Sequence, residues 1–452
     1  MLCKKYSGFF GGIHPADGSD KELSLQSPIV SVTPDVVEIS SEQSTGSICH
    51  FKPVIGDKVT LGDLIGIPKN FTAVNLHASI SGTVTDIKTY EYPRTGAQVT
   101  FLRIEGNGRA AVKTNQEYRF KLMDISHLSR EILLNKMKEG GLTGMGGAGF
   151  PTHIKYETKQ PIDMVLINAA ECEPYLTCDH RLMLEYGMEL INGINLLIKA
   201  AGAQKAILCL EDNKKDAGLY LENLISGLNV PISIKLLPTR YPQGGERQLI
   251  QAVTNTMVPI GGLPADIGII VNNVATAKAM ADLVFGDTPL IARCVTVTGK
   301  VKNPGNYYVP LGTSYSSLLH LAGGITTLNN KVILGGPMTG NCVGIDVTEA
   351  DVYGSVTKTS SAIIVLENSS LTETPCIRCG ACVRICPAGI HPFKIDNAYL
   401  REDLSICEKL FATECIGCGS CSYVCPAKRE LARRNISARN EVKKIRRERQ
   451  VK

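Results

Sequence analysis

Residues 376–387 read CIRCGACVRICP, and residues 415–426 repeat the same spacing as CIGCGSCSYVCP. Each copy sets four cysteines in the order C-x2-C-x2-C-x3-C and places proline directly after the fourth. Two-residue gaps let one short loop present three thiolates to a single metal cluster, and Gly380 and Gly419 permit the tight backbone that such a loop requires. The repeat therefore predicts eight cysteine ligands near the C-terminus.

This spacing is typical of bacterial ferredoxins, in which three thiolates of one run and the fourth of the other run hold each [4Fe-4S] cluster. We therefore expect two [4Fe-4S] clusters with crossed ligation. The expected ligands are Cys376, Cys379, Cys382 and Cys425 for one cluster, and Cys415, Cys418, Cys421 and Cys386 for the other. Structural zinc is the alternative, but zinc takes four ligands, usually as two separated pairs, and does not require two runs of four.

The overall composition is that of an ordinary globular protein. With 452 residues, 44% of them apolar and 20% charged, the chain is long enough for roughly three or four domains. Gly11, Gly12 and His14 stand where a signal peptide needs an apolar core, and no apolar stretch approaches the roughly eighteen residues of a membrane span. We therefore expect no exported or membrane-spanning segment. Sixteen cysteines then favour a reducing compartment, where close-set thiols bind metal.

The net charge of +5 is unevenly distributed, because residues 428–452 hold eleven basic and three acidic residues. Such a tail could be a solvated terminal helix, or it could contact anionic lipid headgroups or an acidic partner. Nucleic acid is not expected as a partner, because no aromatic residue stands among the basic ones after Tyr423.

Residues 1–115 predict a small all-β domain, because Val, Ile, Thr, Gly and Pro are frequent and turn signals separate short apolar stretches. The phrases PVIGDKVTLGDLIG (53–66) and HASISGTVTDI (77–87) resemble the lipoyl/biotinyl-type barrel-sandwich hybrid. Lys69 lies near the place of the carrier lysine in that fold, but it lacks the Met-Lys-Met or Asp-Lys context of true carriers. We therefore expect a scaffold domain rather than a carrier.

Residues 116–288 alternate predicted helices and strands, which is typical of a parallel α/β domain. The first helix is one that Ser126 could cap and that Gly140 ends. Strands are expected at residues 163–169, 205–210, 232–237 and 267–271. Sheets of this kind bind ligands at the loops that leave the carboxyl ends of their strands, so motif residues there indicate function.

Two smaller segments complete the chain. Residues 289–355 contain two β segments around Asn303-Pro304-Gly305, a short helix and a further strand and turn, which predicts a β-grasp (SLBB-like) unit. Residues 356–452 hold the two cysteine runs, a polar helical insert between them and the basic tail. Cys407 lies in the insert and off the motif, so we do not expect it to be a ligand. The expected fold class is multidomain α/β and α+β.

A glycine-rich loop, GMGGAGFPT at residues 144–152, opens the candidate functional site. Its glycines let backbone amides approach a phosphate or a flavin ring closely. It lacks the Gly-Lys-Ser/Thr ending of a P-loop, and it does not follow a strand directly as the Rossmann fingerprint does. Three further phrases stand at expected strand ends: NAAECEP (168–174), YPQGGE (241–246) and the pair Asn272-Asn273. Together the four predict one site at one edge of the sheet.

This set of loops resembles the flavoprotein subunit of respiratory complex I, in which corresponding loops hold FMN and stack NADH against it. The shared patterns are GxGGAGFPT, Asn-x-x-Glu-x-Glu-Pro and a strand-ending Asn-Asn pair. By position, the resemblance implies an FMN-binding set of Gly144, Gly146, Gly147, Lys155, Asn168, Asn272 and Asn273, and Gly244 is a further expected cofactor-binding residue. It also implies that Phe150, Glu173 and Glu246 line the nicotinamide nucleotide side. Two acidic residues of the complex I pattern are Ala170 and Gly245 here, so individual hydrogen bonds differ while the pocket is expected to remain.

These cofactors form a coherent set. NADH gives up two electrons as a hydride, each iron–sulfur cluster carries one electron, and a flavin converts between the two modes. The protein then has to position and tune the cofactors, and no catalytic triad or general base is expected. For Glu173 and Glu246, helix-end capping and surface charge are the alternative interpretation.

The likeness to the RnfC family, which supplies one subunit of the Rnf electron-transport complex, runs nearly from end to end. It is carried by GGIHP (11–15), GGAGFPTHIK (146–155), AECEPYLTCDHRLMLE (170–185), YPQGGERQLI (241–250), VNNVATA (271–277), GGPMTG (335–340) and the two cysteine runs. The resemblance implies a peripheral subunit on the cytoplasmic side of the cell membrane, in a complex that couples NAD and ferredoxin redox chemistry to sodium or proton translocation. This chain would hold the NAD-reactive FMN and two clusters, and a partner iron–sulfur subunit would exchange electrons with ferredoxin.

Two alternatives remain open. Residues 44–50 depart from the family phrase and include Cys49, and some soluble relatives that serve amino-acid reductases or cobalamin reduction carry a reactive cysteine. A soluble NADH-dependent electron-transfer protein is therefore the first alternative. The second is a module that carries clusters but binds neither flavin nor NAD; the whole central segment, which a bare ferredoxin does not need, argues against it.

Overall fold

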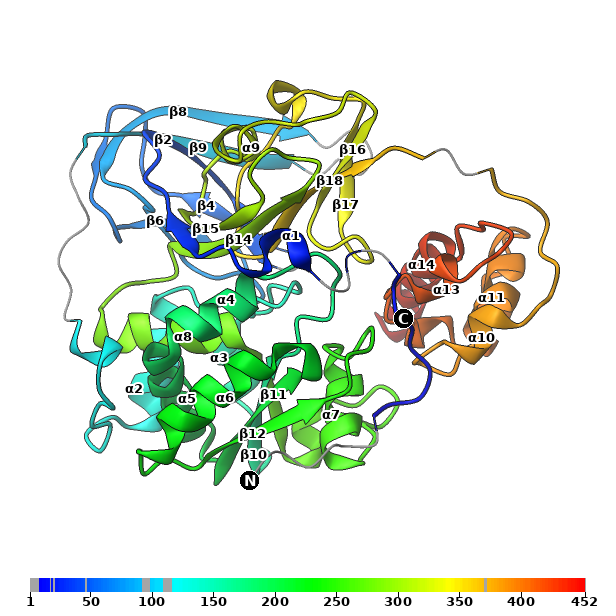
Figure 1. The fold of residues 1–452 in the computed structure, drawn as a ribbon, viewed down its shortest axis with the longest axis horizontal. Helices are drawn as coiled ribbons and strands as arrows, with labels where there is room; N and C mark the ends of the chain where they lie inside the picture. The colour runs from blue at the N-terminus through cyan, green and yellow to red at the C-terminus, as the bar shows by residue number, and fades with distance from the viewer. Residues whose placement is uncertain are drawn as a thin grey trace.

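A computed structural model describes residues 8–16, 18, 21–44, 47–91, 98–108, 116–369 and 372–451. Figure 1 shows two β-rich parts side by side, an α/β part beneath them and a small helical module to one side. The first described residues run between this module and the α/β part, and Gly12 N donates to Ile385 O at 2.8 Å there. A short helix, α1 (Glu22–Leu25), follows this segment.

The N-terminal β domain consists of two four-stranded sheets. One sheet has the order β2 (Val36–Ser40), β9 (Gln98–Gly106), β8 (Gly82–Glu91) and β5 (Lys58–Val59), and the other has β3 (Glu42–Ser44), β4 (Ser47–Phe51), β6 (Leu64–Pro68) and β7 (Leu76–His77). Strands with alternating buried residues, such as Val37 and Ile39 in β2, supply the apolar core between the sheets. The predicted barrel-sandwich architecture is confirmed.

The central domain contains a parallel sheet of the order β12 (Ile232–Leu237), β11 (Lys205–Glu211), β10 (Met164–Ala169) and β13 (Ile269–Asn273). Side chains along β10 alternate between the two faces of the sheet. Val165 and Ile167 pack with helices α5 (Gly187–Ala201) and α8 (Val274–Phe285), whereas Leu166 packs with residues of α7 (Glu246–Thr254). The helices are α2 (Arg130–Glu139), α3 (Thr152–Tyr156), α4 (Cys178–Glu185), α5 (Gly187–Ala201), α6 (Lys215–Ser226), α7 (Glu246–Thr254) and α8 (Val274–Phe285). The predicted parallel α/β domain is confirmed.

One local expectation was wrong. The first helix of this domain, α2, is capped by Ser129, whose side chain accepts a hydrogen bond from Ile132 N at 3.2 Å. Ser126 instead donates its hydroxyl to Asp124, so it belongs to the turn before the helix. Gly140 follows the last helical residue, as expected.

A six-stranded sheet forms the second β-rich part. Its order is β1 (Ile29–Ser31), β15 (Gly305–Pro310), β14 (Ala292–Gly299), β18 (Ala362–Glu367), β16 (Asn330–Leu334) and β17 (Asn341–Ile345), and α9 (Tyr315–Leu321) packs on it. Strands β1 and β18 come from outside the segment 289–355 and pair in parallel with β15 and β14. This sheet therefore unites the N-terminal segment with the residues that lead into the cysteine runs.

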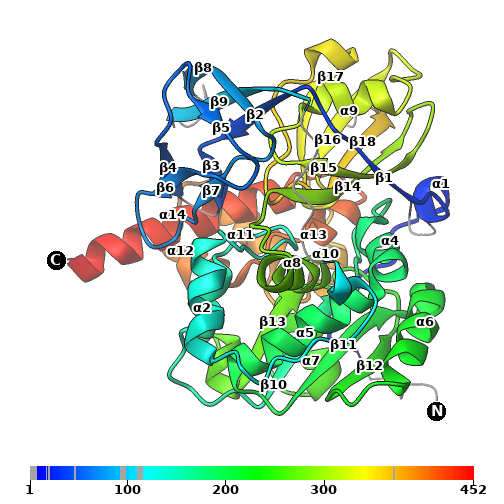
Figure 2. The ribbon, with the colours of Figure 1, turned by 90° about the vertical axis from the view of Figure 1, so that its left-hand side faces the viewer.

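The C-terminal module carries short helices around the cysteine runs and one long helix. They are α10 (Ala381–Arg384), α11 (Pro392–Tyr399), α12 (Leu404–Lys409), α13 (Ser420–Tyr423) and α14 (Leu431–Val451). Figure 2 shows α14 projecting from the body of the molecule. The basic tail is thus a helix, and one of its faces buries Ala438 and Val442 against the insert. Within the described ranges, no helix has the combination of length and apolarity that a bilayer crossing requires.

Candidate functional site

Two cavities in the C-terminal module are each lined by four motif cysteines. One is lined by Cys386, Cys415, Cys418 and Cys421, and we call it the inner cavity. The other is lined by Cys376, Cys379, Cys382 and Cys425, and we call it the outer cavity. The structure therefore groups the thiols in the crossed arrangement that the spacing predicts, with the fourth cysteine of each run at the other cavity.

The donor set of both cavities suits an iron–sulfur cluster. Burial, followed by the neighbouring thiolates, raises the pKa of Cys421 in the inner cavity and of Cys382 in the outer cavity above the usual value for a thiol. Four such thiols ionise together only when a metal centre compensates their charge. Cys407 is buried against Ile395 O at 3.8 Å and lines neither cavity.

The two cavities differ in their surroundings. The inner cavity lies next to the α/β domain, because the Tyr241 hydroxyl donates to Cys418 O at 2.7 Å and Gly12 N donates to the carbonyl before Cys386. At the outer cavity, Cys379 and the neighbouring Ile377 are exposed, and Ile377 keeps 67% of its surface accessible. The inner cavity therefore faces the α/β domain and the outer cavity faces solvent.

The glycine-rich loop lies between α2 and α3 and is held by its own backbone and by a side chain of α8. Gly144 N donates to Phe150 O at 2.8 Å, and Met145 N donates to the hydroxyl of Thr276 at 2.9 Å. The tip of the loop from Gly146 to Ala148 is exposed, and Gly147 has φ 114 with open space where a Cβ would stand. The loop thus presents exposed backbone over the carboxyl end of β13, as a cofactor cradle requires.

The strand-end residues meet at one edge of the sheet. Asn168 and Asn273 are register partners in β10 and β13, and Asn168 Nδ2 donates to Gly244 O at 2.8 Å. Gly244 is closely packed here, because a Cβ added to it would lie 3.3 Å from Cys172 Sγ, closer than an ordinary van der Waals contact. The structure therefore brings three expected cofactor-binding residues together.

The two asparagines that end β13 make internal contacts. Asn272 is buried and donates to the hydroxyl of Tyr156, and Asn273 donates to Asp179 Oδ2 at 2.7 Å while capping α8. Their side-chain amides organise the strand end, and any contact with a flavin would add to these bonds.

Lys155 and Glu246 form an ion pair across the site. Lys155 Nζ lies 3.1 Å from Glu246 Oε1 and donates to Val271 O at 3.0 Å. This contact joins a residue expected at FMN to one expected on the nicotinamide side. Phe150, the aromatic residue expected on the nicotinamide side, is partly buried at the end of the glycine-rich loop.

Glu173 lies apart from that ion pair. Its carboxylate accepts hydrogen bonds from Met338 N at 3.0 Å and from the Thr339 hydroxyl at 2.5 Å, both in the six-stranded-sheet domain. The Tyr241 hydroxyl lies 3.4 Å from Glu173 Oε1. The complex I resemblance did not suggest these partners.

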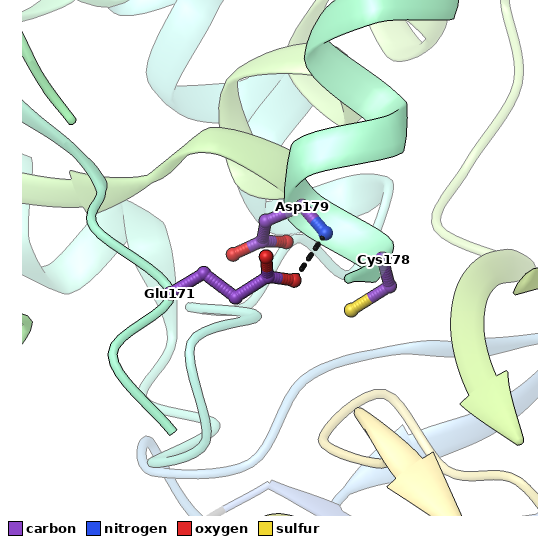
Figure 3. A group of neighbouring side chains, drawn as sticks. All are labelled: Glu171, Cys178 and Asp179. Atoms are coloured by element: carbon purple, nitrogen blue, oxygen red, sulfur yellow. Dashed lines mark hydrogen bonds between the residues drawn. The ribbon is translucent and has the colours of Figure 1, made fainter. Parts of the chain in front are cut away.

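A buried acidic group was missed in the sequence. Glu171 Oε1 accepts from Asp179 N at 2.7 Å, and the side chains of Glu171, Cys178 and Asp179 converge (Figure 3). Burial and the nearby Glu171 raise the pKa of Asp179 to about 6. The Lys21 ammonium lies 3.6 Å from Glu171 Oε2 and already supplies positive charge, so these residues do not need a metal ion. The phrase Glu171-Cys172-Glu173 could have indicated a buried acidic group here. No local pattern in the sequence indicates that Lys21 lies beside it.

Cys49, which motivated the first alternative, is not a reactive thiol. It is 5% exposed, its Sγ contacts Val74 O at 3.1 Å, and burial raises its pKa to about 11. Reactive cysteines need an accessible thiolate.

Models of four known domains match the chain in succession. The RnfC barrel sandwich hybrid domain matches residues 7–109, the Nuo51 FMN-binding domain residues 137–282, the SLBB domain residues 294–341 and the 4Fe-4S dicluster domain residues 375–429. The expected fold class is confirmed by this order of domains, and FMN and [4Fe-4S] clusters are confirmed as the cofactors. The contact residues of these cofactors stay predictions.

Curated relatives cover nearly the whole chain. The C subunit of the Na(+)-translocating ferredoxin:NAD(+) oxidoreductase complex of Acetobacterium woodii is 37% identical over 448 residues, which are 97% of this chain and 98% of that protein. The chain belongs to the RnfC family. The RnfC relative from Clostridium ljungdahlii, the C subunit of a proton-translocating complex, is 36% identical over 397 residues, 85% of this chain and 82% of its own length.

A solved structure also resembles this chain. A crystal structure of an NAD+-reducing [NiFe]-hydrogenase in the H2-reduced state aligns with a TM-score of 0.50 at 22% identity, covering 68% of this chain and 61% of that chain. At this identity the match shows a shared fold alone.

Proposed function

We propose that this chain is the NAD(H)-reactive subunit of an ion-translocating ferredoxin:NAD+ oxidoreductase (Rnf) complex, in which it passes electrons between NADH, FMN and two [4Fe-4S] clusters. The observation that carries this function is the union, in one chain, of an FMN-binding domain and a dicluster domain, in a family whose relatives are named as the C subunit of such complexes. The ion-translocating oxidoreductase activity belongs to the complex, and this chain contributes electron transfer to it.

The residues of the site provide binding and orientation. When bound, the flavin supplies the conversion between hydride and single-electron chemistry. The exposed backbone at residues 146–148 and the Lys155 ammonium offer donors to an anionic cofactor, and Asn168 orders the facing Gly244 turn. Glu246 holds Lys155 at 3.1 Å, so it orients this cation toward the same strand edge. No residue in this set has to act as a general acid or base.

The position of the two cavities suggests how the chain is oriented toward its partners. The inner cavity lies against the flavin domain, whereas the outer cavity opens to solvent at Cys379. We place the partner iron–sulfur subunit, and through it ferredoxin, at the outer side. We also place the chain peripherally on the cytoplasmic face of the membrane, where the exposed Lys443, Lys444 and Arg447 of α14 offer positive charge to lipid or to a partner.

Copurification tests the assignment to a complex. An affinity-tagged chain, expressed in its native host and extracted with a mild detergent, should bring down integral membrane subunits together with bound FMN. The same chain recovered alone from the membrane-free fraction, with flavin and clusters present, would instead support the soluble electron-transfer alternative. Recovery of clusters without any flavin-binding capacity would support the cluster-only alternative.

A further inference from the structure

The GGPMTG loop at residues 335–340 lies at the junction of three parts of the molecule. The Met338 amide and the Thr339 hydroxyl of this loop both donate to the Glu173 carboxylate. Glu173 belongs to the central α/β domain, which we call the flavin domain. On its other side, Met338 O lies 2.6 Å from the place where a Cβ on Gly419 would stand. One short loop of the SLBB-type domain thus contacts both the flavin domain and the turn that carries Cys418.

The glycines of this loop allow those contacts. A Cβ on Gly336 would lie 2.2 Å from Glu173 Oε2, and a Cβ on Gly340 would lie 2.4 Å from Leu334 O. Gly419 has φ 79, a conformation that other residues rarely adopt. A side chain at Gly419 would meet the backbone of Met338, one at Gly336 would displace the Glu173 carboxylate, and one at Gly340 would disturb the loop itself. The contacts on both sides of the loop therefore depend on glycine.

Tyr241 closes the junction from the flavin domain. It is 3% exposed, its hydroxyl donates to Cys418 O at 2.7 Å, and the same oxygen lies 3.4 Å from Glu173 Oε1. Its backbone is also paired with Ile13, where Ile13 N donates to Tyr241 O at 2.8 Å. The carbonyl of a cluster ligand is therefore hydrogen-bonded by a side chain that is fixed at both ends.

We propose that Glu173 is a positioning residue: with Met338, Thr339 and Tyr241 it clamps the Cys418–Gly419 turn of the inner cavity against the flavin domain. This inference rests on the proposed function and assigns Glu173 a role different from nicotinamide binding. The carboxylate has hydrogen-bond donors on both oxygens from within the chain, and its nearest polar partners lead to the cluster turn rather than to Lys155 and Glu246. The clamp fixes how far the inner cavity lies from the flavin site.

Hydrogen exchange of the cluster segment tests the clamp in the reconstituted holoprotein. The variants are Glu173→Gln, Thr339→Val and the double variant, because Thr339 contacts the carboxylate from the far side of the junction. Loss of a charge-assisted hydrogen bond should speed exchange of peptides covering residues 415–426 by about tenfold. The double variant should exceed either single one only slightly, since both remove the same contact. Matched controls are Thr326→Val and Glu131→Gln, which change exposed side chains elsewhere.

Kinetics separate positioning from nicotinamide binding. In Thr339→Val, NADH-driven reduction of the clusters should slow, while KM for NADH stays within about twofold of the parent value. Glu173→Gln should likewise slow cluster reduction without a larger change in KM. Tyr241→Phe, which removes only the hydroxyl, should also alter the EPR spectrum of one of the two reduced clusters. Its control is Tyr353→Phe, at a tyrosine that is 84% exposed.

The inference is overturned if Glu173→Gln raises KM for NADH strongly while Thr339→Val leaves both exchange and cluster reduction unchanged. The proposed function fails differently, because a chain that does not react with NADH could still show faster exchange at residues 415–426 in these variants. The exchange measurement therefore tests the clamp independently of turnover.

Discussion

Each cluster cavity combines cysteines that are close in sequence with one that is far away. Cys386 is about thirty residues from the other three thiols of the inner cavity, and it arrives there because α10 and its following turn place it opposite the second run. Its burial raises the pKa of its thiol, so Cys386 ionises readily only when metal is bound. Removing Cys386 should therefore affect the cluster of the inner cavity and leave the cluster of the outer cavity in place.

We predict that Cys386→Ser lowers the iron content from about eight to about four atoms per chain, because each [4Fe-4S] cluster needs four ligands. Cys407→Ser, at a buried cysteine outside both cavities, is the control and should retain all of the iron. Iron and acid-labile sulfide analysis after anaerobic purification measures both. Full iron content in Cys386→Ser would contradict its assignment as a ligand.

A second residue-scale prediction concerns Asp179, whose pKa is raised to about 6 by burial and by Glu171. The native state binds this proton more tightly than the unfolded state, so the group makes stability fall as pH rises from about 4 to about 6. Asp179→Asn removes that loss and keeps an acceptor for Asn273 Nδ2. The Tm of the variant should therefore rise relative to the parent between pH 5 and pH 7, by the equivalent of about 1 kcal/mol. A Tm difference that is independent of pH would count against the raised pKa.

At the scale of elements, buried polar groups join the domains. The Lys358 side chain, which precedes β18, is fully buried and donates to Asn75 O at 2.8 Å in the N-terminal β domain and to Gly141 O at 2.7 Å before the glycine-rich loop. Gly141 cannot be larger, because a Cβ there would lie 2.2 Å from Asn75 O. One ammonium group therefore fixes the entry to the glycine-rich loop against two other domains.

Lys358→Met should lower Tm, because two buried carbonyls lose their donor, at a cost of about 1–3 kcal/mol. Burial lowers the pKa of Lys358 to about 7, so the unfolded chain binds this proton more tightly and the parent gains stability as pH rises from about 7 to about 10. The difference in Tm by which Lys358→Met falls below the parent should thus widen between pH 7 and pH 9. Thermal unfolding at both pH values measures it, and a constant deficit would show that Lys358 titrates normally.

Elements that depend on local spacing were predictable, and contacts between distant segments were not. The strand predicted at residues 232–237 forms as β12, because its apolar pattern and its flanking turns are local. The crossed cysteine grouping also follows from spacing alone. In contrast, Thr339 reaches Glu173 from 166 residues away, and no local pattern signals such a contact. The cap of α2 was misplaced by three residues because two serines both suited the position.

At the scale of the whole molecule, the domains form a sequence of cofactor sites. The flavin-type loops stand at the carboxyl edge of the central sheet, the inner cavity lies against that domain through Tyr241, and the outer cavity faces solvent. The N-terminal segment and the SLBB-type sheet contact both the flavin domain and the cluster module. The N-terminal segment and the six-stranded sheet therefore connect the flavin domain to the cluster module, and a bare ferredoxin lacks both.

A flavin held in the middle of the chain would supply the conversion between the hydride of NADH and the single electrons of the two clusters near the C-terminus. An anaerobic titration of the flavin- and iron-reconstituted chain with NADH tests this electron path, with flavin and cluster absorbance followed together. We predict that the flavin bleaches and that the cluster absorbance falls in the same titration. A flavin that stays oxidised in excess NADH, or clusters that stay oxidised beside a reduced flavin, would contradict the claim.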